Sequence, residues 1–93
     1  MENKPEGHFV YLLKCADGTL YTGYARDLKK RLSEHNGKSK IEGAKYTRSR
    51  RPVKLLYQEE FASRSDAQQR EYAIKQLSRP QKQLLIKMSK LPT

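Results

Sequence analysis

The residues best able to do chemistry lie on one expected helix near the middle of the chain. At about 100° per residue, one stripe of that helix carries Leu28, Arg31, Leu32 and His35. The two leucines must face a core, so Arg31 and His35 face it or border it as well. A guanidinium can bind phosphate, and an imidazole can exchange protons near neutral pH. The structural alternative is that Arg31 packs its stem and reaches solvent while His35 is a hydrogen-bonded edge residue.

A second expected helix repeats this pattern more faintly with an acidic residue. Glu71 lies about 40° from Ala67 and about 60° from Ile74, at the border of the apolar stripe. The structural alternative is an ion pair with Lys75, one turn further on, worth only about 0.3–0.5 kcal/mol. Arg70 lies closer to the middle of the stripe than Glu71, and the sequence offers no reason for it.

The charge of the whole chain indicates what such groups would act on. The 93 residues contain 20 Lys and Arg against 10 Asp and Glu, giving a net charge of +10 and a pI near 9.9. Such an excess predicts a polyanionic partner, most simply nucleic acid, and the alternative is a basic domain without one. With 35% apolar residues, this length predicts one domain over residues 1–93. We expect a core from about 8 to 88 and flexible ends at 1–7 and 90–93.

The basic residues are concentrated in two stretches without acids. Residues 72–93 form one of them. The other runs from Lys45 to Lys54, and its basic residues are Lys45, Arg48, Arg50, Arg51 and Lys54. Together they favour a surface that follows a phosphate backbone. Tyr46, inside the second stretch, could stack on a base or be an ordinary exposed loop residue. Tyr24, Tyr57 and Tyr72 are expected to be packing residues instead.

Several classes of protein are excluded by the composition. No stretch approaches the roughly 20 apolar residues of a membrane span, and the first residues are too polar for a secretory signal. The lone cysteine, Cys15, cannot form an internal disulfide, and no Cys/His cluster has zinc spacing. We therefore expect a cytoplasmic protein in which Cys15 is a small core residue.

Turn and capping residues divide the chain into six elements. Apolar and aromatic runs predict strands at Phe9–Cys15, Thr19–Tyr24 and Val53–Gln58. Capping and periodicity predict helices at Leu28–Asn36, Asp66–Leu77 and Pro80–Ser89, the second capped by Ser63 or Ser65. The order β-β-α-β-α-α predicts a small α/β (α+β) domain with a three-stranded mixed or antiparallel sheet flanked by helices.

The turn between the first two strands decides whether Tyr11 and Tyr21 share a face. A two-residue turn at Asp17-Gly18 would put the tyrosines on opposite faces, because side chains alternate along a strand. A three-residue loop, Ala16-Asp17-Gly18, instead pairs Cys15 with Thr19 and places both tyrosines on one face. Gly18 then takes a left-handed conformation, which glycine tolerates. We predict the three-residue loop, with both tyrosines, Arg31, His35 and Glu71 converging on one concave surface.

These residues resemble the GIY-YIG nuclease superfamily, in particular its small stand-alone bacterial members. The resemblance covers Phe9 to Lys87 and rests on an ordered set: Val10-Tyr11, Tyr21-Thr22-Gly23, Arg31, His35, Glu71, Gly43-Ala44-Lys45-Tyr46-Thr47 and Arg51-Pro52. Phe9 and Val10 replace the Gly-Ile of the first triplet, and Thr22 replaces the middle Ile of the second. These departures change packing rather than chemistry. We expect no attached DNA-binding domain, in which case a protein partner would supply targeting.

The resemblance implies a role for each residue. It implies one Mg²⁺ or Mn²⁺ ion held by Glu71, a hard carboxylate ligand. Arg31 would clamp the phosphate, and Tyr11 or Tyr21 would accept the proton of the attacking water with His35 beside it. Gly23 would allow close backbone approach under the reacting group. The additional nucleic-acid contacts would come from Lys75 and the Lys45–Lys54 stretch.

Two functions from different classes follow from this reading. The first is a metal-dependent endonuclease acting on DNA or RNA, directed to damaged or branched structures in repair or recombination. The second is a non-catalytic nucleic-acid-binding module that keeps the fold and its charge. The presence of Glu71, Arg31 and both tyrosines favours the first, because a binding module gains nothing from a carboxylate where phosphate approaches.

Overall fold

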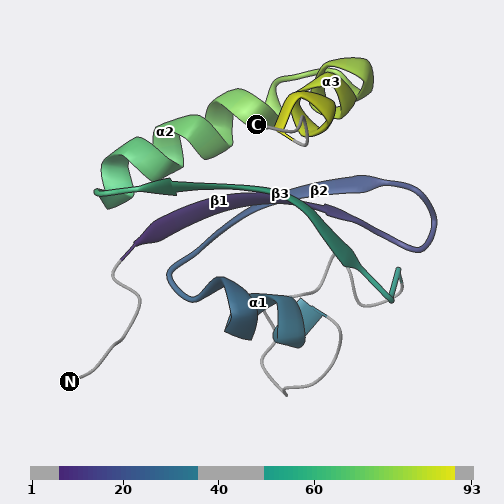
Figure 1. Cartoon of the computed structure of the whole chain (residues 1–93), viewed down its shortest axis with the longest axis horizontal. Helices are drawn as coiled ribbons and strands as arrows, with labels where there is room; N and C mark the ends of the chain where they lie inside the picture. Colours follow the sequence, from purple (N-terminus) through teal and green to yellow (C-terminus); the bar gives the residue numbers. More distant parts are fainter. Residues whose placement is uncertain (1–6, 36–49, 90–93) are drawn as a thin grey trace.

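The structure is a computed structural model of the chain and describes residues 7–35 and 50–89. Its elements follow the expected order (Figure 1). The strands are β1 (His8–Lys14), β2 (Leu20–Ala25) and β3 (Lys54–Phe61). The helices are α1 (Leu28–His35), α2 (Arg64–Lys75) and α3 (Arg79–Ser89). No helix in the described part of the chain is long and apolar enough to cross a membrane.

The three strands form one antiparallel sheet in the order β2-β1-β3, so the expected α/β fold with a mixed or antiparallel sheet is confirmed in its antiparallel form. β1 is the central strand and carries the most buried side chains. β3 continues to Phe61, beyond the expected end at Gln58. The extension contains Glu59 and Glu60, which look like loop residues, but β3 pairs along the whole of β1 and its last residues complete that ladder.

The predicted three-residue loop joins β1 to β2. The Cys15 amide donates to the Thr19 carbonyl at 2.9 Å, and Gly18 has a φ of 88°. The Asp17 carboxylate accepts hydrogen bonds from the amide and hydroxyl of Thr19, which fixes the turn. The resulting register places Tyr11 opposite Gly23 and Leu13 opposite Tyr21. Both tyrosines therefore lie on one face of the sheet, as predicted.

The sheet separates two apolar cores, with α1 on one face and α2 and α3 on the other (Figure 1). Alternation along β1 divides its side chains between them. On the α2 side the buried residues are Val10, Leu12, Tyr57, Ala67, Ile74 and Ile86. On the α1 side they are Tyr11, Leu13, Cys15, Ala25 and Val53, with Leu28 and Leu32 packed against them. Cys15 is thus a core residue, as expected.

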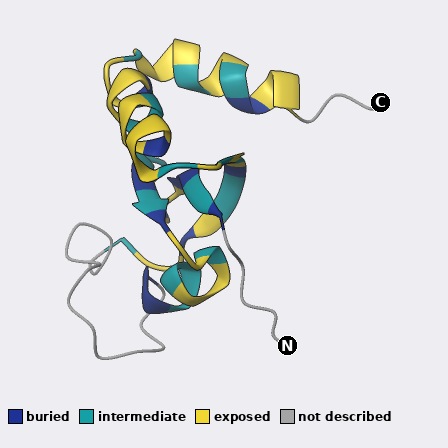
Figure 2. Cartoon of the chain, turned by 90° about the vertical axis from the view of Figure 1, so that its left-hand side faces the viewer, coloured by how far each residue is buried: buried dark blue, intermediate teal, exposed yellow. Residues whose placement is uncertain are grey.

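The helix boundaries refine the expectations. Ser63, rather than Ser65, caps α2, and its hydroxyl accepts the Asp66 amide at 3.1 Å. The expected ends of α1 at Asn36 and Gly37 lie outside the described residues. Tyr72 was expected to pack, and this was wrong, because its exposure is 69%. It lies on the outward face of α2, which Figure 2 shows as largely exposed.

Candidate active site

A hydrogen bond between a strand tyrosine and a helix histidine forms the centre of the site. Tyr11 Oη on β1 lies 2.9 Å from Nε2 of His35, the last residue of α1. Each residue is only 1% exposed. The Tyr11 ring lies over Gly23, where an added Cβ would come within 2.5 Å of Tyr11 Cζ. The Tyr11 phenol therefore fills the space that a side chain at Gly23 would need.

Tyr21 completes an aromatic cluster with these two residues. Its ring centroid lies 5.1 Å from that of His35 and 6.4 Å from that of Tyr11. Tyr21 is half-buried, whereas Tyr11 and His35 are enclosed. We refer to Tyr11, Tyr21 and His35 as the aromatic cluster. Each comes from a different element, and Tyr21 is the member that solvent can reach.

Burial and neighbouring charges keep Tyr11 and His35 neutral. Burial lowers the pKa of His35 to about 4, and the positive charges of Arg31 and Arg51 act in the same direction. Burial also raises the pKa of Tyr11 well above its usual range, with a further contribution from Tyr21. At pH 7 the hydrogen bond between Tyr11 and His35 therefore joins a neutral phenol to a neutral imidazole.

Arg31 extends the site along α1. Its guanidinium Nη1 donates to Glu34 Oε1 at 3.2 Å, and Glu34 is buried at 5% exposure. The Arg31 side chain itself is 32% exposed. Its charge favours the ionised form of Tyr11 and disfavours the ionised form of His35, so it acts on both residues of the hydrogen-bonded pair. Arg31 is thus held beside the aromatic cluster while remaining open to an anion.

Glu71 reaches this region from the other side of the sheet. It lies on α2, opposite α1, and its Oε2 is 3.2 Å from Nζ of Lys75, so the expected ion pair with Lys75 forms. Its negative charge raises the pKa of Tyr11, which places the carboxylate within electrostatic range of the phenol. We expected all five residues to converge on one concave surface. A hollow lies between the end of β2 and α1. Of the five residues it is lined by Arg31 alone, and not by Tyr11, Tyr21, His35 or Glu71.

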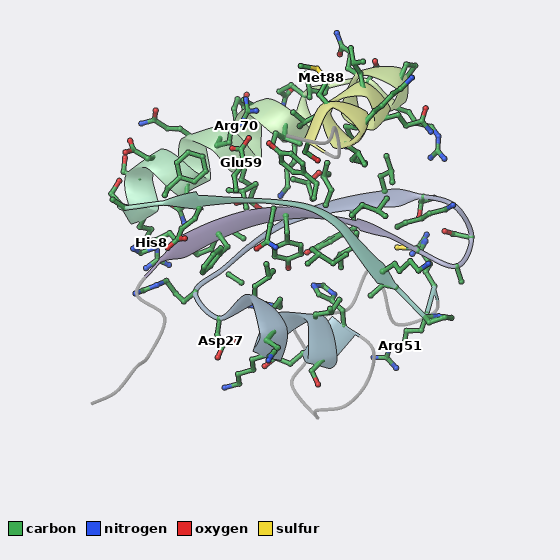
Figure 3. The ribbon with its side chains drawn as sticks, viewed as in Figure 1. His8, Asp27, Arg51, Glu59, Arg70 and Met88 are labelled. Atoms are coloured by element: carbon green, nitrogen blue, oxygen red, sulfur yellow. The ribbon has the colours of Figure 1, made fainter. Side chains whose placement is uncertain are left out.

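The position of Arg70 on the inner side of α2 has a simple cause. Its Nε and Nη2 donate to the two carboxylate oxygens of Glu59 on β3, at 2.9 and 3.1 Å (Figure 3). Burial opposes ionisation of Glu59, but hydrogen bonds from Arg70 and Tyr57 hold the pKa of its carboxyl below the usual value. This bidentate pair ties α2 to β3 directly beside Glu71. The sequence does not indicate this pair, because Glu59 lies beyond the expected end of the third strand at Gln58.

The residues expected to contact nucleic acid differ in how far they are engaged within the protein. Arg50 pairs with Asp17 at 3.0 Å, and Arg51 Nε donates to the His35 carbonyl at 2.8 Å. These arginines therefore also brace the β1–β2 turn and the end of α1. Lys54 is exposed at the start of β3, and Lys75 is exposed while it pairs with Glu71. Lys45, Tyr46 and Arg48 lie outside the described residues.

Three residues that the sequence reading did not select lie near Arg31. The hollow beside α1 is lined by Arg26, Lys30 and Glu34, and also by Tyr24 and Asp27. Arg26 and Lys30 are exposed charged residues, and charged residues on a helix and its preceding turn usually face solvent. Only the four-residue spacing of Arg26, Lys30 and Glu34 could have indicated the hollow.

Comparisons with known proteins agree with this architecture. The UPF0213 protein of Desulfotalea psychrophila is 57% identical over 81 residues, covering 87% of this chain and 72% of its own. The corresponding protein of Staphylococcus saprophyticus is 54% identical over 79 residues, covering 85% and 93%. The solution NMR structure of a protein from E. faecalis matches with a TM-score of 0.64 and 44% identity, covering 100% of this chain and 95% of that one.

A family model covers nearly all of the residues described above. The model of the GIY-YIG catalytic domain matches residues 7–84, which span every element from β1 into α3. The matched range contains Tyr11, Tyr21 and His35 of the aromatic cluster, together with Arg31 and Glu71. Such a domain implies nuclease-type activity and hence a nucleic-acid substrate. The chain therefore belongs to the GIY-YIG catalytic domain family.

Proposed function

We propose that this protein is an endonuclease that hydrolyses phosphodiester bonds in DNA with the help of one Mg²⁺ or Mn²⁺ ion. The observation that carries the proposal is the buried hydrogen bond between Tyr11 and His35, with Arg31 and Tyr21 beside it. A binding module would have no use for a neutral phenol–imidazole pair enclosed next to an anion-binding guanidinium. The high positive charge of the chain supports a polyanionic substrate.

Arg31 is the group that would hold the phosphate to be cleaved. Its partner Glu34 accepts from one guanidinium nitrogen, so further N–H groups remain to face an anion. A guanidinium in this position also stabilises the negative charge that develops on the phosphate oxygens during attack. Because Glu34 is buried, it holds Arg31 in one orientation toward the aromatic cluster.

Tyr21 is the tyrosine that would act as the base: its hydroxyl first gives up its own proton to solvent, and the phenolate oxygen then accepts the proton from the attacking water. It is half-buried and can meet solvent, whereas Tyr11 is enclosed and its hydroxyl is engaged with His35. The raised pKa of Tyr11 also keeps that phenol protonated at neutral pH. Tyr11 and His35 would then orient Tyr21, since the His35 ring packs edge-on against it.

The Glu71 carboxylate is the kind of ligand that a hard divalent cation takes. Mg²⁺ commonly binds through one or two carboxylates and keeps several waters, so a single carboxylate beside a bound phosphate is sufficient. Within residues 7–35 and 50–89, no group of three or more His, Cys, Asp or Glu could enclose a metal by itself. Glu71 would hold the ion, and the ion would activate water and neutralise charge on the phosphate. Lys75 must release Glu71 for this to occur.

Cleavage of plasmid and branched DNA in Mg²⁺ or Mn²⁺ tests the proposal. We expect Glu71→Gln to abolish cleavage while DNA affinity stays the same or rises slightly, because a negative charge near phosphate is lost. Glu60→Gln, which removes an exposed carboxylate on β3, is the matched control and should cleave normally. Equal cleavage by wild type and Glu71→Gln would refute the metal role. Preference for branched over linear DNA would support a role in repair or recombination.

The non-catalytic binding module remains the second candidate. Exposed Arg26, Lys30 and Arg64 would serve binding without chemistry. If wild type binds DNA but never cleaves it with either metal, with or without a targeting partner from cell extract, this second function is the correct one.

A further inference from the structure

A hollow of about 270 Å³ lies between the end of β2 and α1. Its lining includes Tyr24 and Arg26 from β2 and the following turn, and Lys30 and Arg31 from α1. Arg31 is shared between this hollow and the aromatic cluster, because its charge acts on both Tyr11 and His35. A ligand in the hollow would therefore lie directly beside any phosphate that Arg31 holds.

The acidic residues around the hollow are already engaged. Glu34 accepts from Arg31, and the Asp27 carboxylate accepts the Lys30 amide at 3.1 Å, which caps the start of α1. Neither carboxylate pairs with the Lys30 ammonium or the Arg26 guanidinium. Among the described residues, no acidic side chain pairs with Arg26, Lys30 or Arg64. The available charge around the hollow is thus positive.

Further positive charge lies around Tyr24, one of the residues that line the hollow. The Arg64 guanidinium carbon lies 5.8 Å from the Tyr24 ring centroid, and Arg26 Nε donates to the Gly7 carbonyl at 2.9 Å. His8, which marks this end of the sheet in Figure 3, is hydrogen-bonded to the Tyr24 hydroxyl at 2.8 Å. Partial desolvation and the charges of Arg26 and Arg64 lower the pKa of His8. Arg26 and Arg64 therefore bring two positive charges to this end of the sheet, close enough to act on His8.

We infer that this hollow binds the backbone phosphate next to the one that is cleaved, through Arg26 and Lys30. The inference rests on the proposed function, because it takes Arg31 as the clamp for the reacting phosphate. Consecutive phosphates along a strand are one nucleotide apart, so a strand held at Arg31 must place a neighbouring phosphate along the adjacent surface. The hollow offers two cations on that surface, Arg26 and Lys30, with which no acidic side chain in residues 7–35 and 50–89 pairs. It would set the direction in which the strand crosses the site, from β2 along α1.

Salt-dependent binding of the uncleaving Glu71→Gln protein tests this site separately from catalysis. A fluorescent single-stranded oligonucleotide is titrated by anisotropy in EDTA over a range of NaCl concentrations. Each phosphate contact adds about 0.7 to the slope of log affinity against log salt for single strands. Because the hollow holds one phosphate, we expect Arg26→Gln/Lys30→Gln to reduce that slope by about 0.7 and to weaken low-salt affinity by about tenfold.

Lys29 provides the matched control. It is an exposed lysine on the same helix, adjacent to Lys30, but it does not line the hollow. We expect Lys29→Gln to change affinity less than twofold and Lys30→Arg to retain the affinity lost in Lys30→Gln. An abasic strand of equal length should compete as well as the normal strand, because the site contacts phosphate. Circular dichroism melts check that the variants fold.

The outcomes separate the two hypotheses. If the hollow variants bind like Lys29→Gln, or if only base-bearing strands compete, the phosphate site is refuted while the proposed cleavage can still stand. If the hollow variants lose affinity as expected but wild type never cleaves DNA, the phosphate site stands and the proposed nuclease function is refuted. If the Glu71→Gln protein shows no salt-dependent binding, both are refuted.

Discussion

Gly23 on β2 lies directly opposite Tyr11 on β1, and the Tyr11 ring occupies the space that a side chain at Gly23 would need. The glycine is therefore a packing partner of the phenol. An aromatic ring over a cross-strand glycine shields the backbone that the missing side chain leaves open. This packing also places Tyr11 Oη at the end of α1, where it is hydrogen-bonded to His35 Nε2.

Gly23→Ala should disrupt this arrangement. The added Cβ would lie 2.5 Å from Tyr11 Cζ, and the enclosed ring has little room to move. We expect a loss of about 1–3 kcal/mol in unfolding free energy, together with most of the cleavage activity. Urea unfolding measures the first effect. Combining Gly23→Ala with the shorter Tyr11→Leu should restore part of the stability, and strictly additive losses would contradict the contact.

The lowered pKa of His35 predicts how stability depends on pH. The folded value is about 4, whereas an unfolded histidine titrates near 6.5, so between these values the unfolded chain binds more protons. The contribution of His35 to stability is therefore complete above pH 6.5 and is lost as the pH falls toward 4. The physical cause is burial beside Arg31 and Arg51, where an imidazolium would be repelled.

A comparison of wild type with His35→Gln isolates this effect, because the other titrating groups, including His8, are common to both. We expect wild type to be more stable at pH 7 and the difference to shrink as the pH is lowered from 6.5 to 4. Urea unfolding at each pH gives the two curves. A difference that stays constant over this range would show that His35 does not titrate as inferred.

The two tyrosines should differ in what their hydroxyls contribute. Tyr21→Phe removes the solvent-accessible hydroxyl and should lower kcat by about 10²–10⁴-fold with little change in stability. Tyr11→Phe removes the bond to His35 and should cost about 1 kcal/mol of stability with a smaller loss of kcat. Single-turnover cleavage and thermal melts separate these effects. The reverse pattern would identify Tyr11 as the base.

Much of the fold could be predicted because local signals determine it. The three-residue turn with Gly18 sets the register of β1 and β2, and the register alone brings Tyr11 and Tyr21 to one face. Likewise, the stripe that Leu28 and Leu32 bury against the sheet carries Arg31 and His35 to the same face. Spacing along single elements, combined with one turn, was therefore sufficient to place four of the five expected catalytic residues on the α1 side of the sheet.

The remaining features depend on contacts between distant elements. Glu59 and Arg70 pair across β3 and α2, and no periodicity within either element reveals that contact. Tyr72 was misjudged because α2 buries only Ala67 and Ile74, so a residue about 140° from Ala67 faces solvent. Glu71 lies on the opposite side of the sheet from α1, and its approach to Tyr11 depends on how α2 crosses the sheet.

The Lys45–Lys54 stretch should carry more of the DNA affinity than the basic tail. Neutralising Arg48, Arg50 and Arg51 together should weaken binding more than neutralising Lys82, Lys87 and Lys90. Arg51→Gln alone should also lower stability, because Arg51 Nε binds the carbonyl at the end of α1. Filter binding at two salt concentrations and a melt of each variant give the comparison. Equal affinities for the two triple variants would be evidence against the first stretch.

The Glu59–Arg70 pair should stabilise the packing of α2 on β3. Both side chains are partly buried, at 25% and 37% exposure, and their two hydrogen bonds run between the elements that hold Glu71 in place. Arg70→Met should therefore cost about 1–2 kcal/mol, and Arg70→Lys less, because lysine keeps the charge but loses the paired geometry. The exposed Gln68→Met on the same helix is the control. A double-mutant cycle with Glu59→Gln should give a coupling energy of about 1 kcal/mol, and a value near zero would show that the pair does not hold α2.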